Sequence, residues 1–238
     1  MKENINTVFS RMKKTYGLGH TLKFGFSVLT QFIILGIYYK AQKFSFKDEK
    51  YNYFINFLNG THTNERIIEI PLIVNILKKN EYKKILEVGN VISKYYNFPH
   101  TIIDKYEKSE NVFNEDVVDF HPNEKYDLIF SISTMEHVGF DEDEKDSEKI
   151  LRSFENLKSL LQLNGKIIVT MPLGYNKYLD DYIKKGKLGF DNQFFFKKDQ
   201  KYNTWKEMSS IDISKAKYEN KFPPHANELI LAIFKKKN

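Results

Sequence analysis

The sequence predicts an α/β protein with an open, mostly parallel sheet, an antiparallel C-terminal edge and an N-terminal helical and hairpin extension. Short apolar runs bounded by polar residues are typical of buried parallel strands. Four such runs occur: Ile85–Gly89, His100–Asp104, Tyr126–Ser133 and Gly165–Met171. The amphipathic segment Ser147–Leu163 separates the last two, as expected for a βαβ unit. Three further strand-like runs lack long intervening helices, which predicts the antiparallel edge: Gln193–Lys198, Tyr202–Met208 and Glu228–Lys235.

The charge of the chain is concentrated at its N-terminus. Nine basic and three acidic residues fall within residues 1–50, which accounts for the whole net charge of +6. We therefore divide the chain into a basic arm, residues 1–62, and a neutral domain, residues 63–238. A basic arm can meet anionic lipid, nucleic acid or a phosphorylated substrate, or remain solvated. The chain has no cysteine, which excludes disulfides, zinc–thiolate sites and a cysteine nucleophile.

Within the arm, Leu22–Tyr39 (LKFGFSVLTQFIILGIYY) is the most apolar segment. At about 18 residues it is near the lower limit for a spanning helix. Its polar residues recur on one helical stripe, which is typical of an amphipathic helix. These polar residues are Lys23, Ser27, Thr30 and Gln31. We favour packing on the protein, then peripheral contact with a membrane interface, over spanning.

Two elements are expected between the arm and the first strand. Lys43–Phe54 alternates aromatic and polar residues around a Lys-Asp-Glu turn, which predicts a hairpin. Ile67–Lys79 predicts a helix capped by Thr63, with Pro71 near its first turns or at a kink.

Polar residues follow the predicted strands where their carboxyl ends would converge. Gly89 permits a sharp turn after the first strand, and Asp104 ends the second. In dinucleotide folds, an acid about 20 residues after the glycine turn accepts hydrogen bonds from ribose hydroxyls. Asn114–Asp119 predicts another extended piece, from which Asp116 could accept a hydrogen bond from an adenine amine. The structural alternative is that these acids cap helices and that Gly89 only makes a turn.

The ordered motifs KKILEVG, HTIID, NEDVVDF, KYDLIFSISTMEHVG and LNGKIIVTMP resemble those of class I S-adenosylmethionine-dependent methyltransferases. The resemblance covers about residues 64–238 and implies a Rossmann-like fold that binds S-adenosylmethionine. The family expects two or three glycines after the acid of the first motif, whereas EVGN supplies one. We expect Asn90 to replace a glycine by adopting a positive φ; otherwise cofactor binding is weak or lost. The EVGN variant also resembles a subgroup of unassigned substrate associated with surface-glycan genes.

The resemblance also implies roles for individual residues. Glu87, Val88, Gly89 and Asn90 would lie under the methionine part, and Arg66 would meet its carboxylate. Asp104 would hold the ribose, and Asp116 and Val117 would contact the adenine. Ser131 or Ser133 would line the sulfonium side.

Catalysis of methyl transfer needs in-line positioning, and a base if the acceptor is a hydroxyl. His137 follows the third predicted strand, beside Glu136, and has a pKa range suited to a base at neutral pH. The alternative is that this pair only orients the loop. Tyr175 and Asn176 follow the next strand, where they could contact the substrate. The spacing of acids and histidines predicts no metal site.

We therefore expect a methyltransferase acting on an oxygen or nitrogen of a small or glycan-like acceptor, such as a nucleotide-sugar or a surface-glycan sugar in polysaccharide biosynthesis. The neutral domain disfavours nucleic acid as a partner. The expected location is cytoplasmic, with peripheral contact at the inner membrane face through residues 22–39 as an option. The alternatives are a nicotinamide-dependent oxidoreductase and a non-catalytic binding protein with a decayed cofactor crevice. The sequence predicts no oligomeric state.

Overall fold

The computed structural model describes residues 19, 30, 33–56, 61–219 and 224–237. Seven strands form one sheet in the order β4-β3-β5-β6-β11-β7-β8. Their bounds are Ile85–Val88 (β3), Thr101–Ile103 (β4), Tyr126–Ile132 (β5), Leu161–Pro172 (β6), Asn192–Asp199 (β7), Thr204–Met208 (β8) and Glu228–Lys235 (β11). The strands from β4 to β6 pair in parallel, and β11, β7 and β8 continue the sheet antiparallel. The predicted α/β fold with its antiparallel C-terminal edge is confirmed.

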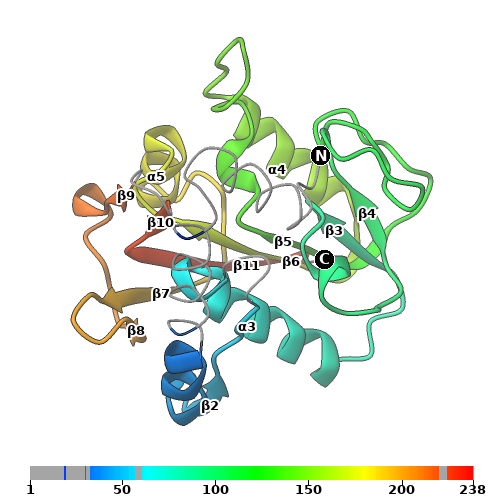
Figure 1. Cartoon of the computed structure of the whole chain (residues 1–238). Coiled ribbons are helices and arrows are strands. Elements are labelled where there is room, and N and C mark those ends of the chain that lie inside the picture. The colour runs from blue at the N-terminus through cyan, green and yellow to red at the C-terminus, as the bar shows by residue number, and fades with distance from the viewer. Residues whose placement is uncertain (1–18, 20–29, 31–32, 57–60, 220–223, 238) are drawn as a thin grey trace.

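Helices cover both faces of the sheet (Figure 1). Helix α3 (Arg66–Lys79) lies on one face, and α4 (Lys149–Leu160) and α5 (Lys177–Lys184) lie on the other. Successive residues of a strand point to opposite faces of the sheet. Phe130 packs into the core on the α3 side, whereas Ile129 packs into the core on the α4 side. Such two-sided burial explains why the parallel strands are continuous apolar runs.

The N-terminal hairpin consists of β1 (Lys43–Phe46) and β2 (Glu49–Asn52), as predicted. Lys47 and Asp48 form its two-residue turn with φ of 49° and 64°, as in the turns that favour hairpins. Phe44 and Phe46 are buried in the same core as α3. The hairpin therefore packs on the body of the protein, while the domain boundary at residue 62 stays a prediction.

Several local expectations were wrong. Helix α3 has Glu65, not Thr63, at its N-cap, and no side chain caps it. Asn114–Asp119 is not a strand: only Phe113 makes a single parallel bridge, with Ile103. Helix α5 was not predicted; the Asn176 side chain caps it by accepting hydrogen bonds from two main-chain N–H groups.

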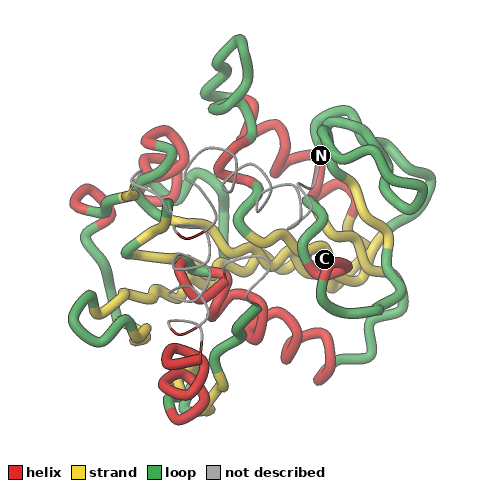
Figure 2. The backbone as a smooth tube through the Cα atoms, in the orientation of Figure 1, coloured by secondary structure: helices red, strands yellow, loops and turns green. Residues whose placement is uncertain are grey.

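The connections on either side of β4 are loops rather than helices (Figure 2). Between β3 and β4 the only helical element is a short 3-10 turn, Ile92–Lys94. Consequently β5–α4–β6 is the one parallel connection in the described chain that contains an α-helix. The remaining short elements are 3-10 turns at Thr61–Thr63, Met135–His137 and Ile213–Lys215, and the strand pair β9 (Tyr218–Glu219) and β10 (His225–Ala226).

The predicted helix Leu22–Tyr39 lies largely outside the described residues; within them, residues 33–41 are helical. Tyr39 is buried and donates a hydrogen bond from its hydroxyl to the Asn203 carbonyl. Three isoleucines of the same helix are exposed: Ile33, Ile34 and Ile37. Within the described ranges, no helix is long and apolar enough to cross a bilayer.

Candidate functional site

A cavity of about 390 Å³, here called the crevice, opens at the carboxyl ends of β3, β4 and β5. The carboxyl ends of parallel strands are where open α/β sheets bind ligands. Its lining includes eight of the residues singled out in the sequence: Arg66, Val88, Gly89, Asp104, Asp116, Val117, Ser133 and His137. Segments far apart in the chain thus converge as predicted.

Gly89 makes the turn that opens the crevice. Its φ is +86°, a conformation that favours glycine. A Cβ placed there would lie 2.2 Å from Oγ1 of Thr134, so a side chain would collide with the crevice wall. Asn90, in contrast, does not adopt a positive φ, and the expectation that it replaces a glycine in this way was wrong. Its side chain instead donates a hydrogen bond to Glu107 (2.8 Å) and accepts one from Ser93.

Asp104 lies at the end of β4 and lines the crevice. Its Oδ1 accepts hydrogen bonds from the main-chain N–H groups of Tyr106 (2.9 Å) and Glu107 (2.8 Å). These contacts fix the carboxylate through Oδ1 alone. A fixed carboxylate with a second acceptor oxygen suits a ribose diol.

The Asp116 side of the crevice is closed by a network of four charges. Lys149 contacts Asp116 (2.6 Å) and Glu142 (2.7 Å), and Lys105 contacts the same two acids at 2.9 and 3.1 Å. Burial raises the pKa of Asp116, but the two lysines outweigh burial and leave it below its usual value. The sequence did not reveal this network, because its lysines come from a loop and from α4.

Glu87 lies outside the crevice and is fully buried. Its Oε1 accepts hydrogen bonds from the N–H groups of Val91 and Ile92 (both 2.8 Å), and its Oε2 lies 2.7 Å from Nε2 of His100. Because Nδ1 of His100 faces the Phe98 carbonyl, both ring nitrogens face acceptors, as in a charged imidazolium. Burial opposes that charge, but Glu87 outweighs it and raises the pKa of His100. Glu87 therefore anchors the β3–β4 loop.

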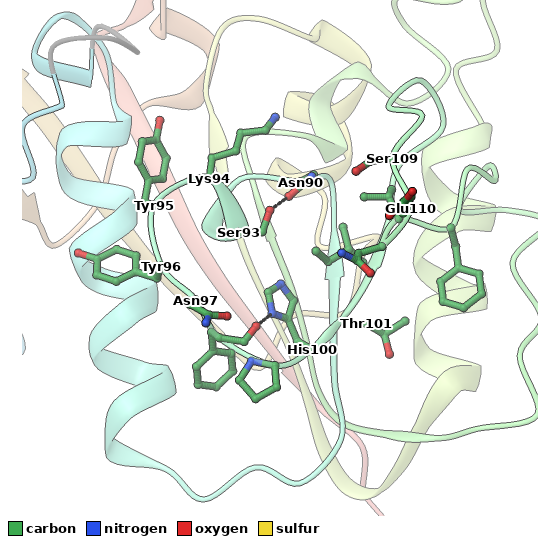
Figure 3. A pocket seen from close by; sticks show the side chains of 16 residues that line it. Asn90, Ser93, Lys94, Tyr95, Tyr96, Asn97, His100, Thr101, Ser109 and Glu110 are labelled. Atoms are coloured by element: carbon green, nitrogen blue, oxygen red, sulfur yellow. Dashed lines mark hydrogen bonds between the residues drawn. The ribbon is translucent and has the colours of Figure 1, made fainter.

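An open groove of about 880 Å³ lies over the same loop, beside the edge strand β4. Figure 3 shows Asn90 and Ser93 joined by a hydrogen bond in its wall, with Tyr95 and Tyr96 on the side nearest α3.

Ser131 is buried within the sheet, where its hydroxyl donates a hydrogen bond to the Val88 carbonyl (2.9 Å). Asn90 and Ser131 are thus not brought into the crevice.

His137 lies at the crevice rim, oriented by an acid that the sequence had not suggested. Its Nδ1 lies 2.5 Å from Oδ2 of Asp141, which also accepts a hydrogen bond from the Tyr175 hydroxyl (2.6 Å). Because a carboxylate only accepts, Nδ1 donates, and Nε2 carries the free lone pair in the neutral ring. Asn176 is buried and donates to the Glu136 carbonyl (2.9 Å), so it holds that main chain in place.

A second cavity of about 330 Å³ adjoins the crevice. Arg66, Ser133 and His137 line both cavities. Glu65, Glu136 and Tyr218 line only the second one. Glu69 of α3 lies behind it, where its Oε1 accepts a hydrogen bond from the Ser133 hydroxyl (2.7 Å). Glu65, Glu69 and Glu136 are 6%, 0% and 1% exposed.

The sequence singled out neither Glu65 nor Glu69. One signal was available: Glu69 interrupts the run Ile67–Ile70 in a helix whose faces are nearly all apolar. Across the described ranges, no group of three or more acids and histidines could hold a metal ion.

The crevice and sheet define an α/β protein with a cavity at the carboxyl edge of a parallel sheet. No protein-family model matches the chain, and no curated protein does. Solved structures that resemble it include the N-methyltransferase NodS of Bradyrhizobium japonicum WM9, in complex with S-adenosyl-L-homocysteine. The identity is 12%, the TM-score 0.46, and the match covers 73% of this chain and 88% of NodS.

Two further structures resemble the chain at similar distance. A S-adenosylmethionine-dependent methyltransferase from Clostridium acetobutylicum ATCC 824 is 13% identical, with a TM-score of 0.37 and coverage of 70% of this chain and 89% of that one. The sugar N-methyltransferase KedS8 from Streptoalloteichus sp. ATCC 53650 is 7% identical, with a TM-score of 0.38 and coverage of 71% and 87%.

Proposed function

We propose that the protein is an S-adenosylmethionine-dependent methyltransferase that binds this cofactor in the crevice and a small or glycan-like acceptor in the second cavity. The observation that supports it best is the convergence of Gly89, Asp104 and Arg66 on one cavity. Gly89 lets the ligand approach the main chain, Asp104 offers acceptors to a ribose, and Arg66 offers a cation to a carboxylate. At about 390 Å³, the crevice has the size of a small-molecule site.

When bound, the cofactor supplies an activated sulfonium methyl. The protein contributes positioning, because Arg66, Ser133 and His137 lie between the two cavities. His137 can take a proton from the acceptor at Nε2, since Asp141 fixes the opposite ring nitrogen. Tyr175 holds Asp141 in turn.

Calorimetry with S-adenosylhomocysteine tests the cofactor assignment. We expect Asp104→Ala to weaken binding by about 10- to 150-fold, since a lost charged hydrogen bond costs about 1.5–3 kcal/mol. Asp119→Ala is the matched control, because this acid is exposed and lies outside the crevice lining. Wild-type binding of NAD in place of S-adenosylhomocysteine would favour an oxidoreductase, and binding of neither would contradict both enzyme functions.

The base is tested separately from the cofactor. We expect His137→Ala to keep S-adenosylhomocysteine affinity within about threefold and to lower methyl transfer by about 100-fold or more. Full transfer by this variant would remove His137 from the mechanism. The alternative role, loop orientation, predicts a loss of cofactor affinity instead.

We also propose peripheral contact with an anionic membrane through the helix at residues 33–41. Ile33, Ile34 and Ile37 are 50%, 66% and 67% exposed, and the basic arm complements anionic lipid. Replacing all three by serine should abolish flotation with phosphatidylglycerol vesicles, whereas Leu163→Ser, another exposed residue, should not. Equal flotation of both variants would contradict this contact.

A further inference from the structure

The second cavity combines buried carboxyl groups with a place beside the proposed methyl donor. We propose that this cavity binds an amine as its ammonium ion and that Glu136 contacts this ammonium ion. Nitrogen would then be the atom that is methylated. This inference rests on the proposed function and deepens it. It is carried by the buried carboxyl groups of Glu65, Glu69 and Glu136.

The first argument is that two of these carboxyl groups are incompletely bonded. Glu136 lines the cavity, yet its Oε2 has no hydrogen-bond partner. Oε2 of Glu69, behind the cavity, also lacks a hydrogen bond, although the Thr170 hydroxyl is close enough to lower the pKa of Glu69. Glu65 is satisfied in part, because its Oε2 accepts from the Ala226 N–H (3.1 Å). Buried polar groups are normally bonded, and an unpartnered one needs an explanation. Binding of a ligand with several hydrogen-bond donors would explain the unpartnered oxygen of Glu136.

The second argument concerns charge. No lysine or arginine in the described part of the chain forms an ion pair with these three acids. Arg66 acts on Glu69 and Glu136, and Lys198 acts on Glu65, only at longer range. Lys94 also lines the cavity, but it pairs with Glu107. Burial, with Glu69 and Glu65 adding to it, raises the pKa of Glu136 well above its usual value. Burial raises the pKa of Glu69 to about 7. An ammonium group would supply the missing positive charge and three donors, whereas a hydroxyl offers one donor and no charge.

The third argument is that the chemistry can be completed by groups already in place. The bound ammonium gives a proton to Nε2 of His137, which leaves a neutral amine with a free lone pair. That lone pair forms the new N–C bond to the methyl as the C–S bond breaks and its electron pair returns to sulfur. The product is a methylated ammonium and a thioether. His137, whose side chain is 44% exposed, passes its proton to solvent.

The experiment uses the smallest probes that share this chemistry, methylammonium chloride and methanol. The full chain is labelled with ¹³C-glutamate and saturated with S-adenosylhomocysteine, and its carboxyl signals are titrated by NMR. Glu136 is assigned as the signal absent from Glu136→Gln. We expect methylammonium to lower the pKa of Glu136 by about 1–3 units relative to sodium chloride, and methanol to leave it unchanged. The exposed Glu144 serves as the internal control.

An unchanged Glu136 titration in methylammonium would overturn the amine proposal. If Glu136→Gln does not fold, calorimetry of the wild-type chain with methylammonium in phosphate and in MOPS buffer decides. Proton release from Glu136 predicts heats that differ between the buffers, and equal heats contradict it. The S-adenosylhomocysteine titration separates the two proposals. Amine binding without cofactor binding would contradict the methyltransferase function, and with it methylation of nitrogen, but not the amine site. Cofactor binding without amine binding would contradict the amine site alone.

Discussion

Glu87 and Glu136 are equally buried, but their surroundings differ. Glu87 accepts hydrogen bonds from two main-chain N–H groups and from a histidine ring, so each of its oxygens has a partner. Glu136 has one oxygen 3.6 Å from Nε2 of His137 and one with no partner. Buried charges are tolerated when they are paired. The contrast indicates that Glu87 serves the fold, whereas one oxygen of Glu136 has no partner within it.

The largest expected effect on the free energy of unfolding comes from breaking the Glu87–His100 pair. His100→Phe keeps the ring packing against Phe98 and Phe130 but leaves Glu87 without its charged partner. Removing one member of a buried ion pair costs about 3–5 kcal/mol, which urea unfolding at pH 6 would measure. The double variant Glu87→Gln, His100→Phe should recover part of this loss. A loss below about 1 kcal/mol would mean that Glu87 is not held by this pair.

A smaller change in stability, of opposite sign, is expected from replacing Glu69, one of the acids without an ion pair. The pKa of Glu69 in the folded state, about 7, lies above its usual value, so folding favours the protonated form. Its contribution to stability is present below the unfolded pKa and is lost as the pH rises through about 7. Glu69→Gln cannot ionise, and its amide oxygen can still accept from Ser133.

We therefore expect Glu69→Gln to be more stable than wild type at pH 8 by about 2–3 kcal/mol, and equal to it near pH 4. Urea unfolding across this pH range would measure the difference. The exposed Glu144→Gln is the control and should show none. A constant difference at every pH would mean that Glu69 is not protonated in the folded state.

The smallest effect concerns the link between the two cavities. Tyr175→Phe removes one hydrogen bond to Asp141 and leaves the bond to His137 in place. Such a loss is worth about 0.5–1.5 kcal/mol, so we expect kcat to fall by about 2- to 12-fold with unchanged S-adenosylhomocysteine affinity. Tyr178→Phe is the nearby control. A fall in cofactor affinity instead would place Tyr175 in the cofactor site.

The sequence predicted those elements whose pattern depends only on local residues. The parallel strands are apolar runs because both their faces are covered, and β11 was predicted with its observed bounds. Helix α5 was missed because it has only eight residues. No α-helix connects β3 to β4; Glu87 and His100 stabilise a loop there.

The site was predictable to the same extent. Gly89, Asp104 and Asp116 converge because parallel strands bring their carboxyl ends together. The role of Glu87 depends on His100, which lies 13 residues along the chain. The role of Ser131 depends on the main-chain carbonyl of Val88, which lies 43 residues away. Glu69 was not found, because only tertiary packing brings it to Ser133. Asp141 was also missed, although it lies four residues after His137 in the same turn.

The wall shared by the two cavities has a thermodynamic consequence. Arg66, Ser133 and His137 face both spaces, so a ligand that moves or charges one of them changes the affinity of the other space. Such coupling is reciprocal: each ligand must alter the dissociation constant of the other by the same factor. Two ligands that occupied these cavities would therefore help or hinder each other to the same degree, whichever bound first.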